Sequence, residues 1–228
     1  MSLALLLSVV GVGYNNIINL WGPFHRGAYV PTNIAFAAGI TTIAVWRLDL
    51  SRAELGLRAD LGSAAIGAAA VAIFAVAAMA VARSRHGHRI ADRRVAGLHG
   101  SRLVHHVLVR IPLGTAVTEE VVFRGVLVAA WLAAGHSPTI AATYASVAFG
   151  LWHISPTVIG VRMNDPGAPA RKLAAAVVGG IVLTTGVGLA LTWLRLETGS
   201  VIGPIILHAG VNSSAALAAV LADRRRRA

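Results

Sequence analysis

The stretch Thr118-Glu119-Glu120-Val121-Val122-Phe123-Arg124 lies inside an apolar run that begins near Ile111 and ends near Ala134. A run of this length can cross a bilayer as a helix, which needs about 20 residues. A charged side chain at the centre of such a helix costs about 2.5–3.5 kcal/mol on insertion scales. Two glutamates and one arginine at this depth therefore need partners, which indicates a functional site inside the membrane. A structural salt bridge in a transporter or scaffold is the simpler alternative.

The composition is that of a membrane protein. The chain has 228 residues, 56% of them hydrophobic and 13% charged, and its mean hydropathy is +0.71. Soluble domains average about 25% charged residues. We therefore expect an all-α polytopic bundle that forms one domain over residues 1–228. The chain has no cysteine, which excludes disulfides and cysteine-ligated metals, and its Arg-rich, Lys-poor composition favours a bacterial source by association.

Seven apolar runs are candidates for membrane-spanning helices. They cover residues 1–21, 29–48, 61–82, 112–134, 139–154, 173–194 and 201–221. Between them, residues 83–110 form the one long polar segment, whose five histidines we expect to be solvated. Val104, Val107 and Leu108 recur at helical spacing and predict an amphipathic helix at the membrane surface. Pro112 is expected to open the fourth span, because proline is tolerated in a first helical turn.

The basic residues predict the orientation of the bundle. With seven spans, the side that carries the C-terminal Arg224–Arg227 tail also carries the polar segment 83–110 and holds most of the 20 basic residues. The positive-inside rule then places the C-terminus in the cytoplasm and the N-terminus outside, in a multi-pass protein of the cell membrane. This distribution accounts for the net charge of +11 without nucleic acid, so the lipid bilayer is the expected partner.

Three short polar motifs interrupt the apolar runs. They are Glu119-Glu120-x-x-x-Arg124, Phe149-x-x-x-His153 and His208-x-x-x-Asn212. The spacing of four residues puts the ends of each motif on one helix face. At about 1.5 Å per residue, the motifs reach similar depths in the cytoplasmic half of the membrane. We therefore expect them to meet in one cavity that opens towards the cytoplasm.

This ordered set of motifs resembles the CPBP family, which groups CAAX prenyl endopeptidases with bacteriocin-processing and bacteriocin-immunity membrane proteins. The resemblance covers residues 112–215, within a motif-bearing core of about 112–222. It implies an intramembrane endopeptidase that cuts a membrane-associated peptide or protein, with prenylated or CAAX-like proteins among the candidates.

The family resemblance also implies roles for individual residues. Glu119 becomes the general base, His153 helps to position the attacking water, and His208 and Asn212 donate hydrogen bonds to the oxyanion. Supporting roles fall to the Glu120–Arg124 ion pair, which holds the site, and to Phe149, which packs beside it.

Three alternatives stay open. Glu119, His153 and His208 are suitable zinc ligands, so the same residues could form a metalloprotease site. A metal-independent glutamate mechanism, with no cofactor, is favoured because the chain has no His-Glu-x-x-His motif. A catalytically silent immunity or scaffold protein on the same fold is the second alternative. A transporter with a proton-relay carboxylate is the third, although the sequence shows no internal repeat.

Overall fold

The computed structural model describes residues 2–22 and 24–227 as a bundle of helices without strands. Met1 of the predicted first span, Pro23 and Ala228 lie outside the described residues. The longer helices are α1 (Leu3–Ile18), α2 (Tyr29–Leu48), α3 (Leu61–Arg83), α7 (Pro138–Trp152), α8 (Ile154–Asn164), α9 (Ala170–Thr198) and α10 (Ile202–Arg227). Two short helical turns, η1 (Phe24–Ala28) and η2 (Gly87–Ile90), lie in the connections.

One further helical run crosses the bundle between residues 100 and 133. It consists of α4 (Gly100–His105), η3 (His106–Val117), α5 (Thr118–Glu120), η4 (Val121–Leu127) and α6 (Val128–Ala133), of which η3 and η4 are π-helical. Each of the seven predicted spans thus corresponds to a helical run. In the described part of the chain, five helices are long and apolar enough to cross a membrane, and α1 is a shorter apolar helix.

The start of this run differs from the sequence prediction. We expected a separate surface helix that ends before Pro112, but residues 100–111 are the first turns of the same helix, and Pro112 lies inside η3. Val107 and Ile111 are buried against α10, whereas Val104 and Leu108 are exposed, so only part of this apolar stripe packs on protein. A proline lacks the backbone N–H of a regular helical ladder. The π-helical stretch already interrupts the regular hydrogen-bond pattern of the α-helix, so it accommodates Pro112.

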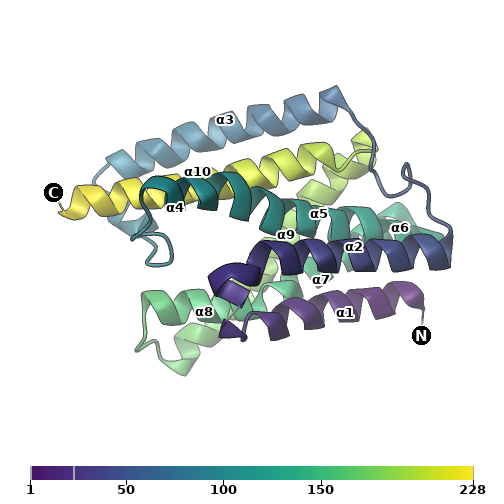
Figure 1. Ribbon diagram of the computed structural model, residues 1–228, viewed down its shortest axis with the longest axis horizontal. Coiled ribbons are helices and arrows are strands. Elements are labelled where there is room, and N and C mark those ends of the chain that lie inside the picture. Colours follow the sequence, from purple (N-terminus) through teal and green to yellow (C-terminus); the bar gives the residue numbers. More distant parts are fainter. Residues whose placement is uncertain (1, 23, 228) are drawn as a thin grey trace.

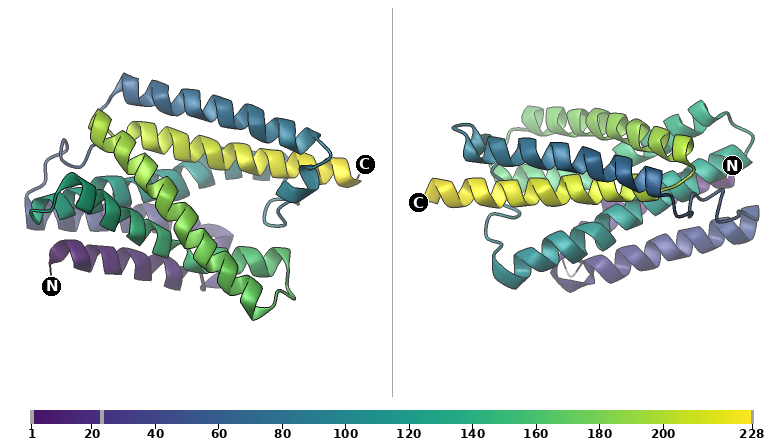
Figure 2. Two further views of the ribbon diagram at one scale, coloured as in Figure 1. Left: turned by 180° about the vertical axis from the view of Figure 1, so that it is seen from behind. Right: turned by 90° about the horizontal axis from the view of Figure 1, so that it is seen from above.

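The helices form two sides of an elongated bundle (Figure 1). The pair α3 and α10 runs side by side along one edge, while α1 and α2 lie at the other, and the termini are at opposite ends. The helix α9 crosses the back of the bundle obliquely and packs on α7 and α8 (Figure 2). A Cβ atom on Gly67 would lie 2.6 Å from the carbonyl oxygen of Gly203, so α3 and α10 meet backbone to backbone.

The main hydrophobic core surrounds η4 and α6. Phe123, Val126 and Leu127 are fully buried there, among apolar residues of α1, α2 and α7. This packing fixes the second half of the long run, and with it the position of the two glutamates on α5. The fold therefore holds the acidic pair in the middle of the bundle.

Candidate active site

The two adjacent glutamates occupy the single α-helical turn of α5 between the two π-helical stretches. Glu119 is 5% exposed and Glu120 is fully buried. Because adjacent helical residues point in different directions, the two carboxylates face different neighbours. Glu119 faces a cavity, whereas Glu120 faces an arginine and a histidine.

Glu119 is held by one hydrogen bond and directed at two histidines. Its Oε1 accepts a hydrogen bond of 3.1 Å from Nε1 of Trp152. Its Oε2 lies 3.8 Å from Nε2 of His153 and 3.9 Å from Nε2 of His208, and it is buried without a hydrogen-bond partner among the described residues. Both separations exceed a direct hydrogen bond and fit a single bridging water oxygen.

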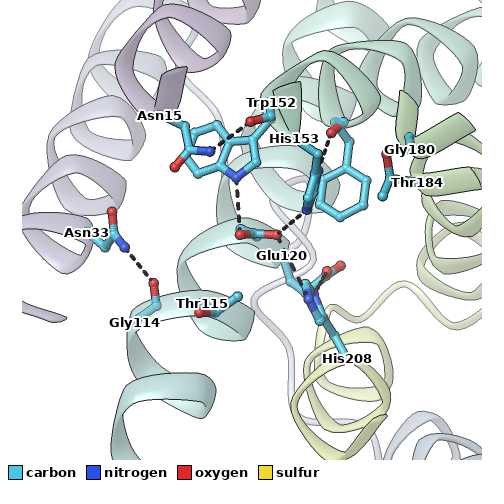
Figure 3. A network of polar contacts seen from close by, with 12 residues as sticks. Asn15, Asn33, Gly114, Thr115, Glu120, Trp152, His153, Gly180, Thr184 and His208 are labelled. Atoms are coloured by element: carbon cyan, nitrogen blue, oxygen red, sulfur yellow. Dashed lines mark hydrogen bonds and ion pairs between the residues drawn. The ribbon is translucent and has the colours of Figure 1, made fainter. Parts of the chain in front are cut away.

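His153 lies at the break between α7 and α8. Its Nδ1 donates a hydrogen bond of 2.7 Å to the carbonyl oxygen of Phe149, which leaves Nε2 with a lone pair directed towards Glu119. Asparagines of α1 clamp the break: Asn15 donates to the carbonyl of Trp152 at 2.8 Å, and Asn16 donates to the carbonyl of Leu151 at 2.9 Å. Figure 3 shows Asn15, Trp152, His153 and His208 arranged around the carboxylates.

Glu120 links two basic side chains. Its Oε1 accepts a hydrogen bond of 3.1 Å from Nη1 of Arg124 and one of 2.7 Å from Nδ1 of His208. Arg124 is also fully buried, and its Cζ lies 4.1 Å from the centroid of the Phe149 ring. The predicted helix-internal ion pair is therefore present, and it fixes the ring of His208 so that Nε2 points towards Glu119.

Asn212 lies one turn beyond His208 on α10 and lines the same cavity as Glu119, His153 and His208. The structure therefore brings all four predicted catalytic residues to one cavity wall. Among the described residues, the two glutamates accept hydrogen bonds from Arg124, Trp152 and His208. Asn212 makes no hydrogen bond to either glutamate there. Their catalytic roles stay predictions.

The cavity has a volume of about 1970 Å³ and extends from Glu119 to the polar end of the bundle. Apolar residues of α3, α9 and α10 form one wall, among them Phe74, Leu183 and Leu207. Basic residues line its outer end, namely Arg94, Arg102, His105, His106 and Arg110. The cavity therefore has an apolar wall, the two glutamate-linked histidines at its inner end and basic residues at its outer end.

The zinc alternative requires Glu119, His153 and His208 to surround one ion. Within the described residues, no group of three His, Asp or Glu side chains is arranged so that it could hold a metal. One oxygen of Glu119 is already bonded to Trp152, and the other is 3.8 Å and 3.9 Å from the two imidazole nitrogens. Metal dependence therefore stays a prediction for either mechanism.

The hydrogen bond from Trp152 to Glu119 was not predicted from the sequence. A buried indole N–H needs an acceptor, and Trp152 lies between Phe149 and His153 of the second motif. A hydrogen bond from this side chain within the site could therefore have been predicted. The bonds of Asn15 and Asn16 to the end of α7 were likewise not predicted. Tyr29 and Thr115 also line the cavity and had no recognisable motif.

Comparison with known proteins gives one match. Residues 102–214, which include all three motifs, match the family model described as type II CAAX prenyl endopeptidase Rce1-like. No curated protein and no solved structure matches the chain significantly. The helical bundle and its apolar spans agree with a multi-pass membrane protein. Through residues 102–214, the chain belongs to the family of Rce1-like CAAX prenyl endopeptidases, which are membrane proteases.

Proposed function

We propose that this protein hydrolyses a peptide bond of a membrane-associated protein with a water molecule that Glu119 and His153 activate. The observation that carries the proposal is the convergence of two imidazole nitrogens on one buried carboxylate oxygen. Nε2 of His153 lies 3.8 Å from Oε2 of Glu119, and Nε2 of His208 lies 3.9 Å from the same oxygen. A water oxygen between them would be held for attack on a carbonyl carbon.

The reaction balances with these residues alone. As the water oxygen bonds to the carbonyl carbon, one water proton passes to Glu119 and the carbonyl π-bond electrons move to its oxygen. The oxyanion then collapses and breaks the C–N bond. The leaving nitrogen takes the proton from Glu119, so that the products are a new C-terminal carboxylic acid and a free amine.

Two residues are placed to stabilise the oxyanion. Glu120 accepts from Nδ1 of His208, so a second proton on Nε2 would form an imidazolium whose charge Glu120 offsets. That Nε2–H and the amide of Asn212 can both donate to the oxyanion from α10. Glu120 and Arg124 act by holding the imidazole, since they lie behind the cavity wall.

The substrate enters from the membrane, in this proposal, with its peptide reaching the cavity at the basic end of the bundle. That end holds residues 84–99 and the C-terminal arginines, and we place it in the cytoplasm because basic loops stay there. The lipid bilayer and a membrane-associated, prenylated or CAAX-like peptide are the proposed partners. Nucleic acid has no role in this account.

The decisive experiment compares membrane peptides of cells that carry the wild-type protein with those of cells that carry Glu119→Ala. New N- or C-terminal peptides that depend on Glu119 would identify substrates and support the protease. If the protein is a catalytically silent immunity or scaffold protein, the two sets of peptides should be identical. Any protection against a bacteriocin should then be unchanged in the variant. The outcome of such a comparison is independent of whether the catalytic water is bound by metal.

A further inference from the structure

The helical run that carries His153 is opened at the turn where α7 meets α8. In a regular α-helix, each backbone N–H bonds to the carbonyl four residues earlier. Pro156 has no N–H, so the carbonyl of Trp152 cannot receive its helical hydrogen bond. The N–H of His153 donates to the carbonyl of Gly150 at 3.1 Å, which is a spacing of three residues. Backbone groups of this turn therefore need partners from elsewhere in the bundle.

Two asparagines of α1 supply these partners, and the amide of Asn16 is inserted into the helix itself. Its Nδ2 donates to the carbonyl of Leu151 at 2.9 Å, and its Oδ1 accepts from the backbone N–H of Ser155 at 2.8 Å. These two backbone groups would bond to each other in a regular helix, so the amide takes the place of one helical hydrogen bond. Asn15 donates at 2.8 Å to the carbonyl of Trp152, which the proline leaves without its helical donor.

Neighbouring groups fix the orientation of both amides. The Nδ2 of Asn16 also donates to the carbonyl of Val12 on its own helix at 2.9 Å. The Oδ1 of Asn15 accepts from Nδ2 of Asn19 at 2.8 Å, which turns the amide nitrogen of Asn15 towards α7. In return, Oγ of Ser155 donates to the backbone carbonyl of Asn16 at 2.9 Å. Each amide nitrogen thus faces a carbonyl and each amide oxygen faces a donor, so only one orientation of each amide fits.

The open turn decides where the imidazole of His153 points. In a regular helix, the carbonyl of Phe149 would accept from the backbone N–H of His153. Here that N–H is directed to Gly150, and the carbonyl of Phe149 accepts instead from Nδ1 of the imidazole at 2.7 Å. This bond places a proton on Nδ1 and leaves the lone pair of Nε2 facing Glu119, as Figure 3 shows from the side of the carboxylates. Closing the turn would return the Phe149 carbonyl to the backbone and take away the partner that holds the ring.

We propose that Asn16 is a positioning residue for His153, because its amide holds open the turn that directs Nε2 at Glu119. This inference rests on the proposed function, in which His153 helps to activate water. Asn16 is not among the described residues that line the cavity, so it acts through the backbone of residues 151–155. It lies outside the three motifs and outside residues 102–214, which match the family model. The N-terminal helix thus contributes to the site without touching the reacting atoms.

The first test reads the tautomer of His153, so it does not depend on turnover. The full-length protein is labelled with 15N-histidine in detergent micelles, and its spectrum at about pH 8.5, where imidazoles of ordinary pKa are neutral, is compared with that of His153→Gln to assign the signal. We expect His153 to carry its proton on Nδ1 in the wild type. Asn16→Leu keeps a side chain of similar size without the amide, and it should convert this signal to a mixture of tautomers.

A matched control lies on the same helix. Ser8 is buried and donates from Oγ to the carbonyl of Ala4 at 2.8 Å, within α1. Ser8→Ala therefore removes a buried hydrogen bond of α1 that does not reach α7, and it should leave the tautomer of His153 unchanged. An unchanged Nδ1–H signal in Asn16→Leu overturns the proposal, whatever the activity of the variant.

A second variant separates positioning from stability. Pro156→Ala restores the N–H that a closed turn needs. In Asn16→Leu combined with Pro156→Ala, the backbone groups of the turn can bond to each other, so part of the thermal stability lost in Asn16→Leu should return. The Nδ1–H signal should stay lost, because the carbonyl of Phe149 is then engaged by the backbone. If the signal returns together with the stability, the role of Asn16 is structural alone and the proposal is overturned.

The double variant also serves if Asn16→Leu does not fold, since it is expected to be the more stable of the two. Once a substrate is in hand, kcat of both variants should be lower by up to roughly 100-fold, as for a displaced catalytic group, with KM little changed. A wild-type kcat despite an altered tautomer overturns the positioning role. A changed tautomer in a protein that cleaves nothing leaves the positioning of His153 standing, while the proposed hydrolysis fails.

Discussion

The indole Nε1 of Trp152 donates a hydrogen bond of 3.1 Å to Oε1 of Glu119, and both side chains are buried. The backbone carbonyl of Trp152 in turn accepts from Asn15 of α1 at 2.8 Å. A chain of two hydrogen bonds thus connects the first helix to the candidate general base. By occupying one carboxylate oxygen, Trp152 directs the other at His153 and His208.

Trp152→Phe tests this positioning. The variant removes the hydrogen bond and keeps most of the packing, so we expect kcat to fall about tenfold, with KM little changed and a stability loss of about 1 kcal/mol. The control is Trp131→Phe, because the Nε1 of that buried indole has no hydrogen-bond partner among the described residues. If both variants lower kcat equally, ring size and not the bond to Glu119 matters.

Arg124→Ala should destabilise the protein as well as inactivate it. The change leaves the carboxylate of Glu120 buried with His208 as its remaining partner, and breaking a buried ion pair costs about 3–5 kcal/mol. Thermal unfolding in detergent and the yield of folded protein measure the loss. Combining Arg124→Ala with Glu120→Gln removes the unpaired charge and should recover part of the stability. A stable, fully active Arg124→Ala protein would show that the pair matters for neither property.

Low pH should loosen residues 84–99, the segment that borders the outer end of the cavity. Burial raises the pKa of Asp92, but hydrogen bonds and the charge of Arg94 outweigh it and hold that pKa below its usual value. A depressed carboxylate pKa stabilises the fold at pH values above the unfolded pKa of about 3.9, and this contribution disappears as the pH falls through the folded value. Asn164 binds the same segment, through the backbone N–H of Arg93.

Hydrogen exchange measures that loosening as protection factors, which correct for the intrinsic pH dependence of exchange. We expect the protection factors of residues 84–99 to fall below about pH 4, while those of α2 stay unchanged. Asp92→Asn should show the lower protection already at pH 7 and little further change on acidification. Equal pH dependence in the variant and the wild type would assign the effect to other groups.

The orientation in the membrane can be tested with reporters. We expect a fusion after Ala228 and a tag inserted near Arg89 to register in the cytoplasm, because most basic residues lie at that end. A tag in the 49–60 connector should register outside and serves as the opposite control. Labelling of the C-terminal fusion from the outer face alone would reverse the orientation and place the cavity mouth on the other side.

The sequence predicted the parts of the fold that depend on apolar length. The seven runs and the meeting of the three motifs followed from hydropathy, helical rise and spacing of four residues. The two π-helical stretches could not be predicted in this way, because a periodicity of 3.6 does not describe them. They change which residues share the face of Glu119, and so Arg110 and Thr115 were missed.

The second kind of miss concerns contacts between distant helices. Trp152, Asn15 and Tyr29 have ordinary roles in apolar helices, and only the packing of α1, α2 and α7 brings them to the site. The helix α8 was also missed, since its apolar pattern is weak and Pro156 marks a turn as readily as a first helical turn. Long-range packing decides these features, and one sequence does not display it.

The last prediction separates the two mechanisms open to Glu119. If this carboxylate takes a proton from water without metal, Glu119→Gln should abolish hydrolysis while the protein still folds, because an amide cannot accept the proton. His208→Ala and Asn212→Ala should each lose about 2.7–4 kcal/mol of transition-state stabilisation as oxyanion donors. Glu197→Gln, an exposed residue of α9, is the control and should keep full activity.

Metal content decides between the accounts on the same sample. The glutamate mechanism predicts that chelators have little effect on a metal-depleted preparation, whereas zinc catalysis predicts loss on chelation, recovery with added zinc and near-stoichiometric metal. Elemental analysis is therefore run beside the activity assay for the wild type and Glu119→Gln. Activity that follows zinc occupancy, with the ion lost when Glu119, His153 or His208 is replaced, would assign those side chains to a metal and remove Glu119 as the base. The proposed protease function would stand in that case, because both mechanisms use the same cavity.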